Sequence, residues 1–256
     1  MLNRNLNMVL TNHISIQERW KKLEDKINLA CTKASRNRNE IIVIGASKKK
    51  SPELIYEAYS SGCTHFGENY VKEAELKISE LCSKTKNANI INLANELELS
   101  PIEFHLIGRL QTNKVRKAVK LFSMIHTVDS LILGKLIAKE FAEISQDKLP
   151  VLLQVNISGE PQKGGILPDF VAEIYSSLIE CSSIEIKGLM SIGSYKSGLS
   201  LKISEFRSLY KIKESIEHQF KIKLPELSMG MSDDFDIAIM EGSTMVRIGT
   251  LLFGER

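Results

Sequence analysis

The chain has 256 residues, of which 43% are hydrophobic and 25% are charged. This composition is ordinary for a globular protein and excludes a disordered chain or a collagen-like fibre. With 34 Lys and Arg against 31 Asp and Glu, the net charge is only +3, which gives no reason to expect nucleic acid or a membrane surface as a partner. The apolar runs fall well short of about 18 residues, so we expect no transmembrane helix.

The N-terminal segment and the cysteines indicate where the protein works. Residues 1–12 lack a sustained apolar stretch, so we expect a short tail there and no secretory signal. The cysteines are scattered, with neither a CxxC pair nor the spacing of zinc ligands; they are Cys31, Cys63, Cys82 and Cys181. Reduced thiols in a cytoplasmic protein are the simplest interpretation.

From residue 40 onward, short apolar β-branched runs alternate with helical patterns. The runs predict strands at 41–47, 64–68, 103–108, 124–128, 151–157, 184–190, 224–229 and 244–249. The helical patterns lie at 52–61, from the second strand up to about 84, and at 113–122, 130–144, 168–179, 201–220 and 232–241, with a further one ahead of the first strand at 14–33. The polar, Asn-rich stretch 83–101 is expected to be the loosest loop.

Eight strands separated by helices predict an α/β fold, a (β/α)8 TIM barrel formed as a single domain by residues 13–256. The alternative is an open doubly wound sheet, which favours a G-x-G-x-x-G turn after the first strand. Here Lys48, Lys49 and Lys50 follow that strand instead. Only residues 250–256 follow the eighth strand, too few for a full closing helix, so the segment 14–33 is expected to cover that side of the barrel.

Functional residues of such barrels lie in the loops after the carboxyl ends of the strands. The loops after strands seven and eight commonly bind phosphate, and here they carry small residues: Ser228, Gly230, Ser232, Gly249 and Thr250. Their backbone N–H groups and a helix starting at Ser232 would attract an anion. The alternative is that Ser232 merely caps that helix, with Asp233 and Asp234 in its first turn. If a phosphate binds, these carboxylates are expected to point away from it. Arg247, within strand eight, is a buried cation that needs a partner.

Lys48 ends the first strand, where burial would lower its pKa and leave a neutral amine able to form a Schiff base with an aldehyde. The alternative is that the three consecutive lysines form a solvated basic turn. Strand alternation favours Lys48 among them, because Lys49 points to the opposite face and Lys50 lies a pleat further out. His105 and His126 lie within predicted strands and are expected as hydrogen-bonded residues inside the barrel rather than as acid–base groups.

Eight segments, in order, resemble the pyridoxal phosphate homeostasis proteins, single-domain barrel relatives of alanine racemase with the type III fold of pyridoxal 5′-phosphate (PLP) proteins. They are SK (47–48), FGENYVKE (66–73), FHLIGRLQTNK (104–114), HTVDS (126–130), QVNISGEPQKGG (154–165), GLM (188–190), LSMGMSDD (227–234) and GSTMVRIGTLLFG (242–254). The resemblance covers the chain from about residue 14 to its end. It implies PLP as the cofactor.

The resemblance also implies a role for each site residue. Lys48 aligns with the lysine that holds PLP as a Schiff base, and Arg247 with an arginine beside the cofactor ring. Asn69 falls at the ring side. The positions of the phosphate cradle are occupied by Ser228, Gly230, Gly249 and Thr250.

The family points to a PLP-binding protein of intracellular PLP homeostasis rather than an enzyme. A racemase needs a second base, supplied in alanine racemase by a tyrosine paired across a dimer with a second domain; neither Tyr70 nor Tyr195 is marked for that role. We therefore expect a cytoplasmic monomer that binds PLP, with PLP-dependent apoenzymes as possible recipients. The alternatives are a type III PLP enzyme such as an amino-acid racemase, and a binding module without a cofactor.

Overall fold

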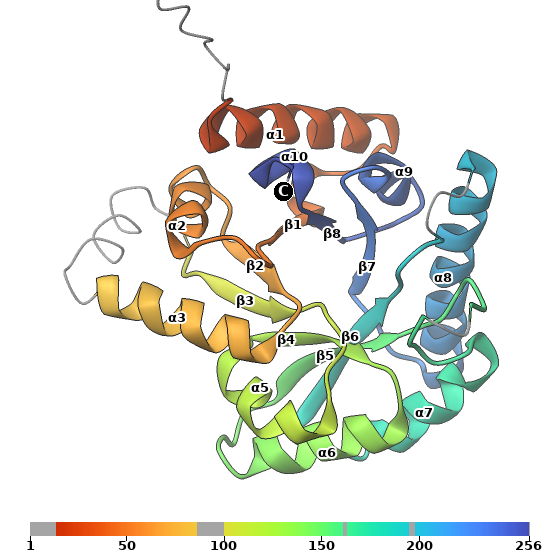
Figure 1. Ribbon diagram of the computed structural model, residues 1–256. Coiled ribbons are helices and arrows are strands. Elements are labelled where there is room, and N and C mark those ends of the chain that lie inside the picture. The colour runs from red at the N-terminus through yellow and green to blue at the C-terminus, as the bar shows by residue number, and fades with distance from the viewer. Residues whose placement is uncertain (1–13, 86–99, 161–162, 195–197, 256) are drawn as a thin grey trace, which may run out of the picture.

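In the computed structural model, which describes residues 14–85, 100–160, 163–194 and 198–255, eight parallel strands close into a barrel in chain order. The first strand pairs with the last (Figure 1). This confirms the predicted (β/α)8 barrel. The strands are β1 (Ile42–Ala46), β2 (His65–Glu68), β3 (Glu103–Leu106), β4 (Met124–Val128), β5 (Leu149–Gln154), β6 (Ile184–Met190), β7 (Glu226–Met231) and β8 (Met245–Ile248).

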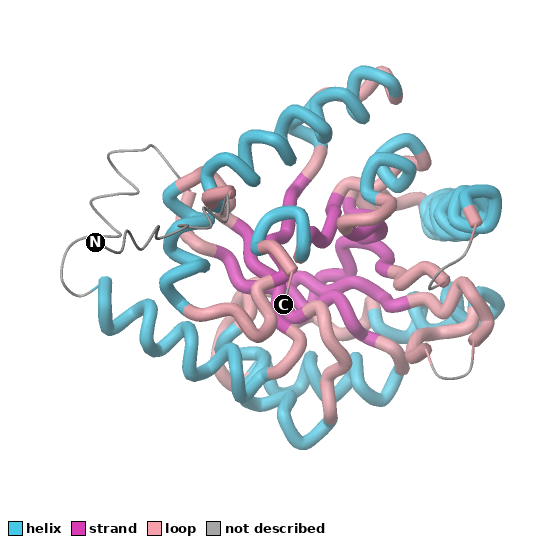
Figure 2. The backbone as a smooth tube through the Cα atoms, turned by 45° about the horizontal axis from the view of Figure 1, so that its top comes forward, coloured by secondary structure: helices cyan, strands magenta, loops and turns pink. Residues whose placement is uncertain are grey.

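Helices surround the barrel on its outer side (Figure 2). They are α1 (Ile16–Lys33), α2 (Pro52–Ser60), α3 (Val71–Thr85), α5 (Val115–Leu121), α6 (Leu131–Ala142), α7 (Val171–Leu178), α8 (Leu199–Phe220), α9 (Phe235–Met240) and α10 (Thr250–Phe253), with short 3-10 turns at Arg38–Glu40, Thr112–Lys114 and Pro168–Phe170. None of the helices in the described ranges is long and apolar enough to cross a membrane. The expected tail 1–12 and most of the predicted loop 83–101 lie outside the described residues.

The helix α1 covers the side of the barrel where β8 meets β1, as predicted. It begins with a capping box between Ser15 and Glu18 and buries Leu23 and Ile27 one turn apart. It packs against both α9 and the four-residue α10 (Figure 1). The helix that closes the barrel is therefore the one that precedes the first strand.

The barrel interior has its own small apolar core, separate from the larger one between strands and helices. It consists of Ile44, Met124, Leu152, Met190 and Met245, with Ile42 packed against it. Because side chains alternate along a strand, the face of β1 that carries Ile42 and Ile44 also carries Lys48 beyond its carboxyl end. The interior polar residues stand next to this apolar layer.

The turn between β7 and α9 differs from the prediction. The strand continues to Met231 and the helix starts at Phe235, not at Ser232. Gly230 has a φ of +90°, and a Cβ there would lie 2.5 Å from the Cβ of Ala238. The Asp234 carboxylate accepts the N–H of Met231 at 2.7 Å, which forms a further turn before the helix. The expected cap at Ser232 and the helix dipole starting there are therefore wrong, because α9 begins at Phe235 with Asp234 at its N-cap position.

Candidate functional site

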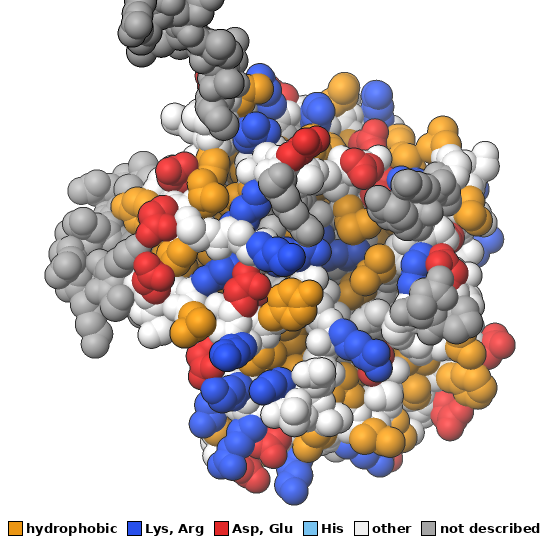
Figure 3. Space-filling model, in the orientation of Figure 1, with side chains coloured by type: hydrophobic (Ala, Val, Ile, Leu, Met, Phe, Trp, Pro, Cys, Tyr) orange, Lys and Arg blue, Asp and Glu red, His pale blue; other side chains and the backbone are white. Residues whose placement is uncertain are grey.

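Lys48 lies in a tight turn at the carboxyl end of β1, at the barrel mouth. The turn is closed by a hydrogen bond of 2.9 Å from the N–H of Lys50 to the carbonyl of Ser47, with Lys49 in the left-handed conformation. Lys48 is half-buried, whereas Lys49 is exposed. In Figure 3, Lys and Arg side chains gather near the middle of the face viewed in Figure 1, where β1 and β8 lie.

A buried ion pair holds this turn from behind. Glu68, at the end of β2, is fully buried and pairs with Lys77 of α3 at 2.9 Å. The Lys77 ammonium also donates to the carbonyl of Ser47 at 2.7 Å, and the Ser47 hydroxyl donates to Glu68 at 2.7 Å. Glu73 pairs with Lys77 at 2.6 Å and accepts the backbone N–H of Lys49. These contacts fix the backbone on both sides of Lys48; burial raises the pKa of Glu68 against the opposing effect of Lys77.

Arg247 of β8 is a buried cation with neutral partners. Its guanidinium donates to the Ser228 hydroxyl at 2.7 Å and to the carbonyl of Ser191 at 2.8 Å. Burial lowers its pKa to about 10, so the group is charged at neutral pH. Among the described residues no carboxylate forms an ion pair with it, and the nearby Asp234 pairs with Lys202 at 3.0 Å. A buried charge without a counter-ion is costly, so this position favours an anionic or electron-rich ligand.

The loops after β7 and β8 meet at the mouth. The hydroxyl of Ser232 accepts the backbone N–H groups of Gly249 at 3.2 Å and Leu251 at 3.5 Å. A Cβ on Gly249 would meet only the Cβ of Ala46, at 3.8 Å, so space is open above it. Thr250 is exposed beside it. The structure thus brings together the predicted loop residues, with amide donors converging on one oxygen.

Two further predicted residues lie at different depths. The hydroxyl of Ser228 is buried below the loops and is shared between Arg247 and Nδ1 of His126, at 3.1 Å from the latter. Asn69 follows β2 at the mouth and is half-buried. Its backbone is fixed by the close approach of Gly108, where a Cβ would lie 2.4 Å from the Asn69 carbonyl oxygen.

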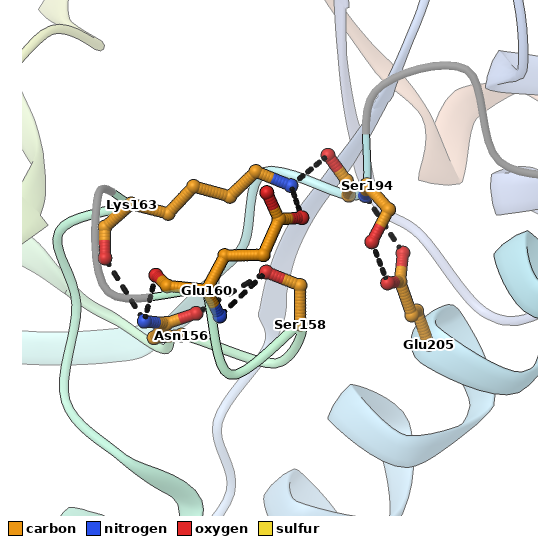
Figure 4. A network of polar contacts seen from close by, with 7 residues as sticks. Asn156, Ser158, Glu160, Lys163, Ser194 and Glu205 are labelled. Carbon is orange, nitrogen blue, oxygen red and sulfur yellow. Dashed lines mark hydrogen bonds and ion pairs between the residues drawn. The ribbon is translucent and has the colours of Figure 1, made fainter.

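The rim over β5 and β6 is a separate polar network (Figure 4). Asn156 donates to the carbonyls of Glu160 at 3.0 Å and Lys163 at 2.9 Å, and Lys163 pairs with Glu160 at 2.6 Å. The Lys163 ammonium also reaches the carbonyl of Gly193 at 3.1 Å, and the adjoining Ser194 binds Glu205 of α8. These contacts join the two loops to each other and to α8, so the network supports the mouth.

The interior histidines are buried and hydrogen-bonded, as predicted. Nε2 of His105 lies 3.0 Å from Nδ1 of His65, and Nδ1 of His105 lies 3.0 Å from Nε2 of His126. In the described ranges, the only three residues placed to hold a metal are His65, Glu103 and His105. The facing nitrogens of the two histidines already bond to each other, so we interpret this group as a hydrogen-bonded pair beside a carboxylate.

Comparison with known proteins identifies the family. The pattern of the family described as alanine racemase, N-terminal domain, matches residues 22–256. The pyridoxal phosphate homeostasis protein of Aquifex aeolicus is 39% identical over 93% of this chain and 97% of its own length. The chain belongs to the pyridoxal phosphate homeostasis protein family. The resemblance found in the eight sequence segments is thereby confirmed.

Solved structures agree with this assignment. The structure of PipY from Synechococcus elongatus with PLP bound has a TM-score of 0.76 and 31% identity, and covers 93% of this chain and 100% of that one. Alanine racemase from Corynebacterium glutamicum, with a TM-score of 0.64 and 14% identity, shares the fold over 93% of this chain and 59% of its own. This homeostasis-family chain therefore has the barrel of alanine racemase.

Sequence reasoning missed the residues that hold Lys48 in this homeostasis-family barrel. Glu68 ends strand two, and Glu73 and Lys77 stand one helical turn apart in the helix that follows it. A signal was present, since Glu73 and Lys77 have the i, i+4 spacing of a helical ion pair. Their target, the turn after β1, becomes visible only when β2 and α3 are placed beside it.

Proposed function

We propose that this protein binds PLP at the barrel mouth, with Lys48 as the covalent attachment point, and serves PLP homeostasis. The observation that carries the proposal is the buried, charged Arg247, which has neutral partners and lies one strand from Lys48. The PLP-bound PipY structure supports the choice of ligand. The Lys48 amine would attack the aldehyde carbon, form a C=N bond and release one water.

The residues at the mouth suit the parts of this ligand. The backbone N–H groups of Gly249 and Leu251 converge on the Ser232 oxygen, and a phosphate oxygen that displaced this hydroxyl would accept the same two donors. Ser228, Gly230 and Thr250 complete our proposed binding set, with Asn69 beside the ring. When bound, PLP supplies an electrophilic aldehyde and an aromatic ring that can accept electrons. A charged Arg247 facing the ring nitrogen would oppose protonation there and weaken the ring as an electron acceptor.

We further propose that binding and release, rather than catalysis, is the activity. The relatives carry the name of homeostasis proteins. Tyr70, a candidate second base, is 57% exposed and Tyr195 lies outside the described residues. In our proposal the protein acts in the cytoplasm as a monomer that can pass PLP to apoenzymes. The free thiols of Cys31, Cys63 and Cys181 suit a reducing compartment.

The proposal is tested by adding PLP to the purified full chain and recording visible absorbance after dialysis. We expect a retained visible band in the wild-type protein and its loss in Lys48→Ala, because the band belongs to the imine and the variant lacks the amine that forms it. Lys49→Gln is the matched control, since Lys49 is the exposed neighbour in the same turn, and should keep the band. A wild-type protein that stays colourless, or a Lys48→Ala protein that keeps the band, contradicts the proposal.

A second measurement separates storage from racemisation. The PLP-loaded protein is incubated with L-alanine in heavy water, and exchange of the α-proton is followed by NMR. We expect no exchange above that given by free PLP, because a protein that only binds and releases PLP places no base against the α-proton of an amino acid. Exchange at the rate of an enzyme turnover would replace our proposal with the racemase alternative.

A further inference from the structure

A continuous line of hydrogen bonds runs through the barrel interior from its amino-terminal end to a buried point below the mouth. It starts at His65 of β2, which is 23% exposed at the amino-terminal end, and passes through His105 of β3 and His126 of β4. It ends at the hydroxyl of Ser228, below the mouth, where Arg247 donates. The three links between His65 and Ser228 measure 3.0, 3.0 and 3.1 Å.

The two inner histidines are neutral at neutral pH. Burial lowers the pKa of His105 to about 3, with a contribution from His65, and burial lowers that of His126 well below its ordinary value, helped by His105 and Arg247. A neutral imidazole has one N–H donor and one acceptor nitrogen. Each link needs one of each, so every ring must point its proton the same way along the line. The line therefore has two possible directions.

Arg247 makes Ser228 the point where the direction is chosen. The guanidinium can only donate, so the Ser228 oxygen accepts from it in either case. The serine's own proton then goes either to Nδ1 of His126 or up toward a ligand at the mouth. In the first case both inner histidines carry their proton on Nε2. In the second case both carry it on Nδ1.

We propose that the line from His65 to Ser228 is a proton relay whose direction is set by the ligand at the mouth. This inference rests on the proposed PLP site. When a ligand accepts a hydrogen bond from the Ser228 hydroxyl, His126 must donate to the Ser228 oxygen, and His105 and His65 reverse in turn. The charge of the relay is unchanged by the reversal.

The reversal conserves protons. One proton passes from Ser228 to Nδ1 of His126, the next from Nε2 of His126 to Nδ1 of His105, and the next from Nε2 of His105 to Nδ1 of His65. The last leaves Nε2 of His65 for water. Ser228 would regain its proton from an acidic group of the incoming ligand, whose deprotonated form Arg247 would stabilise.

The charges at the far end favour this exit. Glu103 has a carboxylate oxygen 3.7 Å from Nδ1 of His65 and 3.8 Å from Nε2 of His105. Glu226, at the start of β7, also acts on His65 and raises its pKa, although burial lowers that pKa overall. Two carboxylates beside a partly exposed imidazole stabilise a proton in transit. No such groups adjoin His126, which faces His105 and Arg247.

The test is NMR of the full chain with ¹⁵N-labelled histidine, free and loaded with PLP. The ring ¹⁵N shifts report which nitrogen carries the proton. We expect His105 and His126 both protonated on Nε2 in the free protein and both on Nδ1 in the loaded protein. The exposed His218 is the internal reference and should not change.

Ser228→Ala removes the switch point, so the loaded variant should keep the tautomers of the free protein. Ser191→Ala is the matched control, because its buried hydroxyl has no hydrogen-bond partner in the described structure and its carbonyl still binds Arg247. The visible band shows whether PLP is bound in each sample. A loaded wild-type protein with unchanged tautomers, or different tautomers on the two inner histidines in any state, overturns the relay. If the band is absent, the proposed function is refuted instead. The free protein then still tests the hydrogen-bonded line, because His105 and His126 must carry their protons on the same ring nitrogen.

Discussion

Lys77→Met is expected to lower the free energy of unfolding by about 3 to 5 kcal/mol, because it leaves the Glu68 carboxylate buried without its cation. The pair is 2.9 Å long, and the side chains of Lys77 and Glu68 are 9% and 0% exposed. The same substitution removes the donor to the carbonyl of Ser47 and so loosens the turn that holds Lys48. The variant should therefore also bind PLP more weakly.

Urea unfolding of the ligand-free protein measures this change. Lys117→Met is the matched control, since Lys117 pairs with Glu75 at 2.8 Å with the two side chains 59% and 40% exposed, and should cost less than about 1 kcal/mol. Adding Glu68→Gln to Lys77→Met should recover part of the loss, because no uncompensated charge stays buried. Equal effects of Lys77→Met and Lys117→Met would show that the buried pair does not hold this end of the barrel.

Acidification is expected to destabilise the protein through His105. Its pKa is lowered from 6.5 to about 3 in the folded barrel, mainly by burial. The unfolded chain therefore binds a proton at His105 between these values while the folded chain does not, so stability is full above pH 6.5 and falls as pH falls toward 3. This shift corresponds to at most about 5 kcal/mol. His126, whose pKa is lowered in the same direction, adds to the loss.

The measurement is the free energy of unfolding across that pH range in the wild type, His105→Gln and His218→Gln. Replacing His105 removes the titrating group, so the loss with acid should become shallower even though the variant starts less stable. His218 is exposed, and its substitution should leave the slope as in the wild type. A slope that is the same in all three proteins would show that other groups control the acid response.

Sequence patterns place the strands well where the barrel is regular. The bounds of β4 and β6 agree with the prediction. The pattern fails at the end of β7, where Gly230 at positive φ and the Asp234 turn prolong the strand to Met231. Those features depend on the packing of Ala238 against Gly230, which periodicity does not encode.

Sequence patterns likewise predict only part of the candidate site. Strand alternation indicates that Lys48, His126 and Arg247 face inward, and the structure places the latter two in one hydrogen-bonded line. Which residue on one strand meets which on the next depends on the stagger of the barrel, so the pairing of His105 with His65 cannot be read from either strand alone. The support of Lys48 by Lys77 is likewise invisible until α3 is packed on the barrel.

The closure of the barrel by its two chain ends has a consequence for folding. β1 pairs with β8 across nearly the whole sequence, and α1 packs on the last short helix. Such distant contacts form late and slowly, because the chain between them must already be ordered. Lys48 follows the first of these strands and Arg247 stands on the last, so the proposed binding site is incomplete in a nascent chain until its final strand has been added. A ligand held by both residues would then stabilise only the finished barrel and slow its opening at this seam.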